Sequence, residues 1–264
     1  MNAFQLTDKS EPAKELAGGA QTVHRAMLVL RLVSLGQEVG VRLVDLVAMS
    51  GLTPPTTRRL LRALIEEQAI QQDPFTRRYR IGREITLLGL ACPSQLHLRS
   101  AAGPILERIS QRTGETTLLG VRQAFDSICI ARSIGSRQVK VMSIETGMRS
   151  PLGAAAAGHA LLMGMTDRQV ADILKENALR LHKLGFDVDL AFKRVEAARK
   201  LGFAWVENGI RPGTHAIAVP VKGPEDQVVA ALTVVALKSQ FNSKEVESVS
   251  GLLMDAAATM IRPQ

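Results

Sequence analysis

Three arginines on one side of a short amphipathic segment are the residues whose spacing most clearly suggests chemistry. At about 100° per residue, residues 54–68 place three leucines within one arc and three arginines within the nearly opposite arc. An apolar side that packs on a core, with guanidinium groups on the other side, suits a helix in the major groove of DNA. The same arginines would also suit a solvated helix face, so the flanking segments must decide. The two sets are Leu60, Leu61 and Leu64, and Arg58, Arg59 and Arg62.

The segments before this helix predict a helix-turn-helix. Residues 22–35 carry apolar residues at three- and four-residue spacing, and residues 43–50 predict a second, shorter helix that stops at Gly51. Thr53 followed by Pro54 is a helix start signal, because a hydroxyl caps the first turn and proline is favoured at the first helical position. Two short helices joined by a turn that contains glycine form this motif.

A basic hairpin directly follows the motif. Residues 69–72 and 77–82 predict two short strands, and Asp73 with Pro74 predicts the turn between them. Such a hairpin is placed to contact the phosphate backbone or the minor groove beside the helix. We therefore expect a winged helix-turn-helix whose DNA contacts come from Thr56, Thr57, Arg58, Arg59, Arg62, Arg77, Arg78 and Arg80.

The distribution of charge supports an anionic partner. The chain of 264 residues has a net charge of +8, and residues 21–99 contain eleven arginines and no lysine against six acidic residues. Guanidinium groups bond phosphates and guanine edges in bidentate fashion. With 46% hydrophobic residues the chain can bury a core, and its longest apolar stretches are too short to span a bilayer. The protein is expected to be cytoplasmic, with no membrane partner.

Beyond about residue 100 the pattern becomes mixed. Strand-like and helical runs alternate irregularly, which predicts an α+β domain with a largely antiparallel sheet packed by helices. We expect a flexible tail at 1–20, the winged helix-turn-helix at 21–83, a helical linker at 84–99 and an effector-binding and oligomerisation domain at 100–264. The expected strands are 116–121, 127–134, 138–144, 203–207, 214–221 and 227–237, and the expected helices are 104–112, 154–164, 167–176, 188–201 and 243–261.

Nearly the whole chain resembles the IclR family of transcriptional regulators. The resemblance covers about residues 21–261 and depends on the order and spacing of several segments. It implies a repressor or activator that binds an approximately palindromic operator as a homodimer or homotetramer, with a small-molecule effector in its C-terminal domain. The segments are QTVHRA at 21–26, GLTPPTTRRLL at 51–61, DPFTRRYRIG at 73–82, SPLGAAAAGHA at 150–160 and GTHAIAVPV at 213–221.

The resemblance also implies the effector-binding residues. Some members carry an acid, a cysteine and a hydroxyl where this chain has Val206, Ala216 and Val235, whereas Thr233 keeps a hydroxyl. The pocket is therefore more apolar than one built for glyoxylate or pyruvate. Either the effector is a larger apolar carboxylate, aromatic or branched, or these positions are plain core and the effector site is absent or elsewhere. The implied positions are Ala156, Ala157, Val206, Ala216, Thr233 and Val235.

Motifs that signal catalysis are missing from the sequence. It contains no GxSxG, HExxH, GxxxxGK[ST] or strand-linked GxGxxG pattern, and its histidines and two cysteines lack metal-ligand spacing. We therefore expect no enzyme activity, no cofactor and no metal. The alternative is a metabolite-binding or enzymatic domain whose basic N-terminal unit mediates protein association instead of DNA binding.

Overall fold

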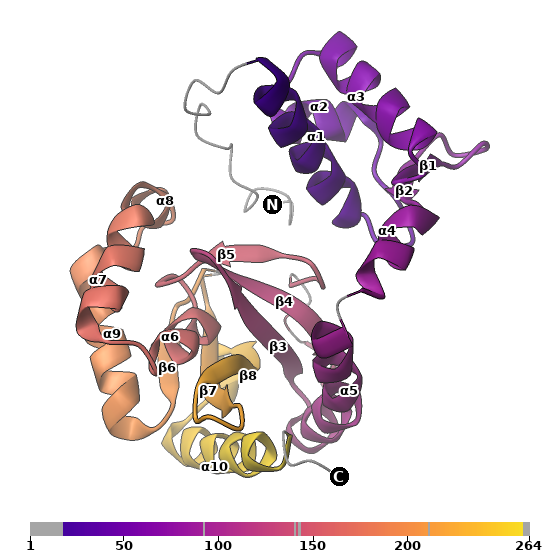
Figure 1. Ribbon diagram of the computed structural model, residues 1–264. Helices are drawn as coiled ribbons and strands as arrows, with labels where there is room; N and C mark the ends of the chain where they lie inside the picture. The colour runs from indigo at the N-terminus through magenta and orange to yellow at the C-terminus, as the bar shows by residue number, and fades with distance from the viewer. Residues whose placement is uncertain (1–17, 92, 140, 142–143, 211, 261–264) are drawn as a thin grey trace. The chain divides into compact units, whose positions relative to one another are not determined.

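The chain forms two compact units, which divide between His97 and Leu98. The computed structural model describes residues 18–91, 93–139, 141, 144–210 and 212–260 (Figure 1). Each unit has its own hydrophobic core. The predicted tail lies outside the described residues as far as residue 17, and Gly18–Ala20 already belong to the first helix.

The first unit is a winged helix-turn-helix, as the sequence predicted. Its first three helices pack through aliphatic side chains such as Val29, Leu46 and Leu61, and Tyr79 of the hairpin forms an antiparallel bridge with Val41. The short antiparallel hairpin closes the core beside the third helix. Its elements are α1 (Gly18–Ser34), α2 (Leu43–Ser50), α3 (Pro54–Glu66), β1 (Ile70–Gln72), β2 (Tyr79–Ile81) and α4 (Arg83–Gly89).

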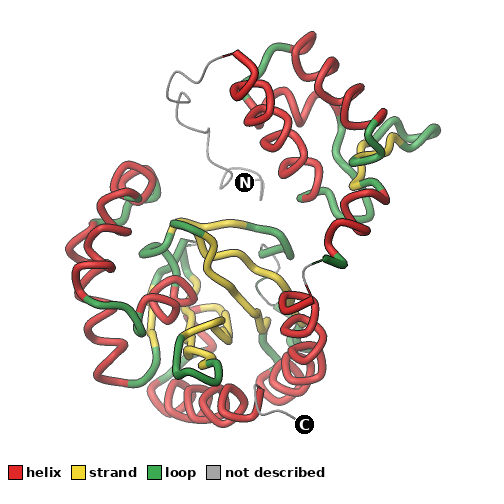
Figure 2. The backbone as a smooth tube through the Cα atoms, viewed as in Figure 1, coloured by secondary structure: helices red, strands yellow, loops and turns green. Residues whose placement is uncertain are grey.

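The second unit is built on one curled, six-stranded sheet in the order β5-β4-β3-β8-β7-β6. All neighbouring strands in it are antiparallel, which confirms the predicted fold class. Figure 2 shows the strands of this unit gathered together, with helices around them. The elements are α5 (Pro93–Thr113), β3 (Thr116–Gln123), β4 (Asp126–Ser133), β5 (Arg149–Pro151), α6 (Ala156–Leu162), α7 (Asp167–Glu176), α8 (Ala178–Lys183), α9 (Val188–Leu201), β6 (Ala204–Glu207), β7 (Thr214–Lys222), β8 (Val228–Leu237), η2 (Lys238–Gln240) and α10 (Ser243–Met260).

The two faces of this sheet carry different cores. Because side chains alternate along a strand, Leu232 and Val234 of β8 point to the face covered by α5 and α10. Ala231 of the same strand points to the opposite face, where α6, α7 and α9 pack. Figure 1 shows α6 inside the curl of the sheet. The sheet therefore separates two helical layers, and alternate residues of β8 face one layer or the other.

The predicted strand at 138–144 is wrong for the residues that the structure describes there. Val139 is exposed, and Val141 packs as a loop residue beside Leu118 and Cys129. The backbone of Val141 is satisfied by a side chain, because the Thr116 hydroxyl donates to its carbonyl oxygen over 2.6 Å. The Gln240 amide likewise donates to the Val139 carbonyl oxygen at 3.0 Å, so side chains hold the described residues of this segment.

Candidate functional site

Helix α3 is fixed at its start by its own sequence. The Thr53 hydroxyl oxygen accepts the backbone N–H of Thr56 at 3.4 Å, and proline occupies the first helical positions. Before it, Gly51 ends α2 in the left-handed conformation with φ of 66°, which glycine adopts without strain. Leu60 and Leu61 anchor the inner side of the helix in the core. The orientation of α3 is therefore set by a cap, a turn and two buried side chains.

The outer side of α3 presents three free guanidinium groups. Arg58, Arg59 and Arg62 are all exposed. Among the residues that the structure describes, none of these three side chains has a hydrogen bond or an ion pair. Each therefore keeps all its N–H donors available for a phosphate or a base edge.

The two threonines of the first turn have different fates. Thr56 is half-buried, and its hydroxyl oxygen accepts a hydrogen bond from the Thr53 hydroxyl at 2.9 Å. Thr57 is fully buried, and its hydroxyl donates to the Thr53 carbonyl oxygen at 3.1 Å. The prediction that Thr57 contacts DNA is therefore corrected, because this side chain supports the helix from inside.

The wing is held by its turn and by two of its arginines. Asp73 accepts the backbone N–H groups of Phe75 and Thr76 at 3.1 and 2.7 Å. Arg80 lies 3.6 Å from Asp73, and Arg78 donates to the Gly40 carbonyl oxygen at 3.0 Å. The remaining wing arginine, Arg77, is exposed and stands at the tip with φ of 57°. Two predicted contact residues thus brace the wing, and the Arg77 side chain has no partner among the described residues.

Phe75 at the tip of the wing was missed by the sequence analysis. Its side chain is 93% exposed, although a large aromatic residue normally buries most of its surface. It follows Asp73-Pro74 in a turn, and an aromatic residue in a polar turn was the available signal. An exposed apolar side chain at a wing tip suits contact with the sugar edge or the minor groove.

The predicted effector residues of the sheet lie on one face. Val206 of β6, Ala216 of β7 and Val235 of β8 stand opposite one another in three neighbouring strands. Thr233 lies two residues before Val235, so it points to the same face. The structure therefore brings these four side chains into one patch, called here the effector face.

Helix α6 adds the two predicted alanines to the effector face. Ala156 is the first residue of α6 and is buried in the same core as Val206. Ala157 lies over β3, because a Cβ added to Gly120 of that strand would be 3.5 Å from the Ala157 Cβ. The Thr233 hydroxyl is buried beneath this helix layer, with no hydrogen-bond partner among the described residues. The face is thus apolar apart from one unsatisfied hydroxyl.

Burial controls the ionisable groups near this face. It lowers the pKa of His159 in α6 to about 3, and the nearby Arg194 guanidinium adds to the effect. Burial also raises the pKa of Cys129, which lies on β4 in the same buried cluster as Val235, to about 12. His159 is therefore neutral and Cys129 is a thiol at pH 7, so neither brings a charge to the site.

The described part of the chain offers neither a metal-binding cluster nor a membrane-spanning helix. No three His, Cys, Asp or Glu side chains there come together in a way that could hold a metal ion. Within the same residues, no helix combines the length and the apolar character needed to cross a bilayer. The predicted interface on α3 and the effector face are thus the two sites that the sequence and fold define together.

Comparison with known proteins places these sites in a family. Residues 22–74 match the IclR helix-turn-helix domain, and residues 91–262 match the bacterial transcriptional regulator IclR C-terminal domain. The chain is 25% identical to the HTH-type transcriptional regulator XynR of Escherichia coli K12, over 92% of this chain and 96% of XynR. It is 28% identical to the transcriptional repressor AllR of Salmonella paratyphi A, over 90% and 88% of the two chains.

Solved structures agree with this placement. An IclR transcriptional regulator from Alicyclobacillus acidocaldarius has a TM-score of 0.71 at 24% identity, covering 91% of this chain and 97% of the other. An IclR homologue from Microbacterium hydrocarbonoxydans, solved with 4-hydroxybenzoate, has a TM-score of 0.70 at 22% identity, covering 90% and 96%. Both likenesses concern the fold. With both domain families matched along most of its length, the chain belongs to the IclR family of bacterial transcriptional regulators.

Proposed function

We propose that the protein recognises a specific, approximately palindromic DNA operator and that a small organic acid controls this binding. The free guanidinium groups of Arg58, Arg59 and Arg62 on a leucine-anchored helix carry the proposal. A homodimer or homotetramer would present two such helices to two half-sites, and light scattering on the purified protein measures that state. Such a regulator acts in the cytoplasm, as a repressor or an activator.

Sequencing the genomic fragments that the purified protein retains would identify the operator. Fluorescence anisotropy then compares an operator duplex with a scrambled duplex at several salt concentrations. We expect affinity for both duplexes to fall steeply as salt rises, because bound phosphates release counterions. Retention of proteins but no DNA would instead support a basic unit that mediates protein association.

Single substitutions separate base reading from phosphate contact. Arg58→Ala should reduce discrimination between the two duplexes by about 1–3 kcal/mol, the value of a bidentate base contact. Arg77→Ala, at the wing tip, should weaken binding to both duplexes alike. The control is Arg168→Ala, which removes an equally exposed positive charge from α7. Full discrimination after alanine replacement of Arg58, Arg59 and Arg62 together would exclude α3 as the reading helix.

The effector face supports an apolar carboxylate as the organic acid. Val206, Ala216 and Val235 offer an aliphatic row to a hydrophobic group. The Thr233 hydroxyl, buried without a partner among the described residues, is a donor for a carboxylate oxygen. The Microbacterium homologue was solved with 4-hydroxybenzoate, an acid of this class.

Thermal denaturation with added acids tests this choice. We expect 4-hydroxybenzoate or 3-methylbutanoate to raise the Tm more than glyoxylate does at equal concentration. Thr233→Val should remove most of that difference. Thr117→Val is the matched control, because its hydroxyl is equally buried and unpartnered in the described part but its β8 neighbour, Val234, belongs to the opposite face. Selective stabilisation by glyoxylate would contradict an apolar effector, and no response to any acid would favour a plain core.

A further inference from the structure

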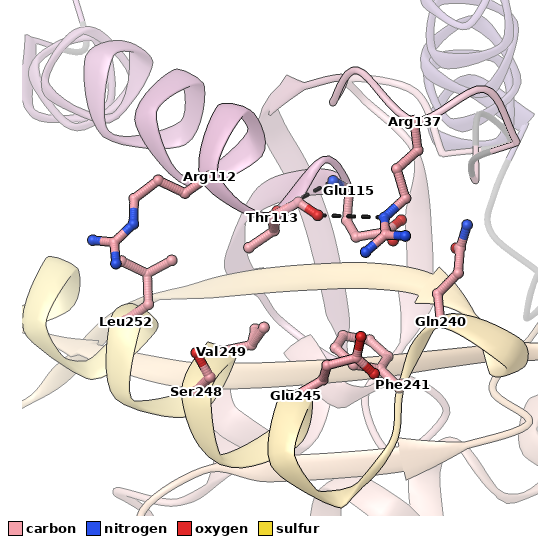
Figure 3. Close-up of a pocket in the computed structure, with 10 residues that line it drawn as sticks. All are labelled: Arg112, Thr113, Glu115, Arg137, Gln240, Phe241, Glu245, Ser248, Val249 and Leu252. Atoms are coloured by element: carbon pink, nitrogen blue, oxygen red, sulfur yellow. Dashed lines mark hydrogen bonds and ion pairs between the residues drawn. The ribbon is translucent and has the colours of Figure 1, made fainter.

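A cavity lies away from the effector face, between the end of α5, the loop after β4 and the first turns of α10. Its volume is about 190 Å³. Figure 3 shows it with charged side chains at two ends: Glu115, Arg137 and Glu245 on one side, and Arg112 on the other. This separation of charge within one cavity is the feature that points to a ligand.

The buried carboxylate of Glu115 is incompletely paired. Its side chain is only 3% exposed, and its Oε1 atom lies 2.7 Å from Arg137 Nε. Both carboxylate oxygens are buried without a hydrogen-bond partner in the described part of the chain, and the ion pair with Arg137 is made through Oε1. Burial raises the pKa of Glu115, whereas Arg137 opposes that rise and Glu245 adds to it. A cationic group that reached Oε2 would therefore stabilise the ionised carboxylate.

The backbone fixes Arg137 over Glu115. Gly114 has φ of 74°, and a Cβ there would lie 2.8 Å from Arg137 Cγ. A Cβ on Gly135 would lie 2.1 Å from backbone atoms of Gly114, so the two backbones meet closely. Arg137 N–H also donates to the Gly114 carbonyl oxygen at 3.1 Å. The arrangement is thus built by two glycines, not by the chance position of a flexible side chain.

The Glu115 end of the cavity has one negative charge in excess. Glu245 is half-buried, and one of its oxygens accepts the backbone N–H of Asn242 at 2.7 Å. With Glu115 it makes two carboxylates against the single guanidinium of Arg137. Phe241 adds an aromatic wall to the cavity. Carboxylate oxygens beside an aromatic ring suit an ammonium group.

The Arg112 end offers the opposite chemistry. Arg112 is exposed, and within the described chain its guanidinium has no hydrogen bond or ion pair. Ser248 supplies a hydroxyl on the same wall, and Leu252 supplies an aliphatic surface. A guanidinium beside a hydroxyl suits a carboxylate.

We propose that this cavity binds a small zwitterionic amino acid with an apolar side chain. The ammonium group lies at Glu115 and Glu245, the carboxylate lies at Arg112, and the side chain contacts Phe241 and Leu252. A cavity of roughly 150 Å³ accommodates benzene, so this cavity has room for an aliphatic amino acid. The protein then responds to two ligands at separate sites, an acid on the effector face and an amino acid here.

Isothermal titration of the full-length protein with L-leucine tests the proposal. Isopentylamine and 4-methylpentanoic acid are the matched probes, because each has only one of the two charged groups of leucine. We expect leucine to bind with one site per chain and each probe to bind at least about tenfold more weakly. The titration contains no DNA, so its result is independent of operator recognition.

Two substitutions locate the site. Glu115→Gln keeps the shape of the side chain, and Arg112→Gln changes an exposed residue that the fold does not need; each should weaken leucine binding about tenfold. The controls are Glu107→Gln and Arg108→Gln, which change charge on the exposed surface of α5 outside the cavity. Absence of leucine binding, equal binding of leucine and isopentylamine, or unchanged binding by Arg112→Gln would each overturn the proposal.

Discussion

His159 is a single buried side chain whose protonation should be visible in the stability of the whole second unit. Burial holds its pKa at about 3, below the ordinary value of 6.5. As the pH falls from 6.5 to about 3, the imidazole of His159 binds a proton in the unfolded chain but stays neutral in the folded chain. The free energy of unfolding should therefore fall with decreasing pH, with this residue contributing up to about 1.4 kcal/mol per pH unit.

Urea denaturation of the parent protein and of His159→Leu between pH 7 and pH 4 measures this contribution. The variant should lose part of the pH dependence. His182→Gln is the control, because His182 is exposed on α8. If the free energy of unfolding depends on pH equally in His159→Leu and in the parent protein, the folded protein does not disfavour protonation of this imidazole.

Thr57 shows what single residues reveal in a sequence and what they hide. It precedes Leu60 and Leu61 by three and four positions, so helical periodicity by itself is consistent with a buried position. Its polar type instead favoured a contact with DNA. The three arginines were predicted to be exposed and are exposed. Periodicity was thus the better guide to burial, because a hydroxyl can satisfy itself on a carbonyl oxygen one turn earlier.

The wing is an element whose shape depends on one side chain that makes no DNA contact in our proposal. Asp73 Oδ1 accepts two backbone N–H groups of the turn, and Oδ2 lies 3.6 Å from Arg80. Asp73→Ala removes both interactions, so the wing loses its fixed turn and operator affinity should fall severalfold. Asp73→Asn retains an oxygen that accepts the N–H groups of the turn, so its operator affinity should fall less. Anisotropy titrations rank the three proteins, and equal affinities would show that the wing does not need its turn.

Helices and strands could be predicted where the local sequence pattern is complete. The prediction failed where a contact with a distant residue determines the backbone structure. The start of α3 is marked by a local cap, Thr53 followed by Pro54. The start of α10 is marked by another local cap, in which Asn242 and Glu245 bond each other's backbone N–H groups. The segment around Val139 and Val141 alternates like a strand. The residues described there form no strand ladder, and the Thr116 hydroxyl holds the Val141 carbonyl oxygen instead. Such a tertiary contact leaves no local signal.

At the scale of the molecule, the cavity beside Glu115 could not be predicted from the sequence. Its charged residues come from two stretches, 112–137 and 240–252, that the fold brings together. Nothing in the spacing of Glu115, Arg137 and Glu245 links them along the chain. The residues of the effector face could be predicted from the family resemblance, whereas no resemblance pointed to the residues that line this cavity. Sites built at the junction of helices and loops therefore need coordinates.

The separate cores of the two units predict separate unfolding. Leu61 belongs to a core formed entirely by residues before His97, and Leu232 belongs to one formed entirely by residues from Leu98 onwards. Leu61→Ala and Leu232→Ala should each remove about 2–5 kcal/mol from one unit only. Differential scanning calorimetry should show two transitions, with a different one lowered in each variant. If either substitution lowers both transitions together, the units unfold as one cooperative body, and a ligand bound in the second unit would stabilise the DNA-binding unit directly.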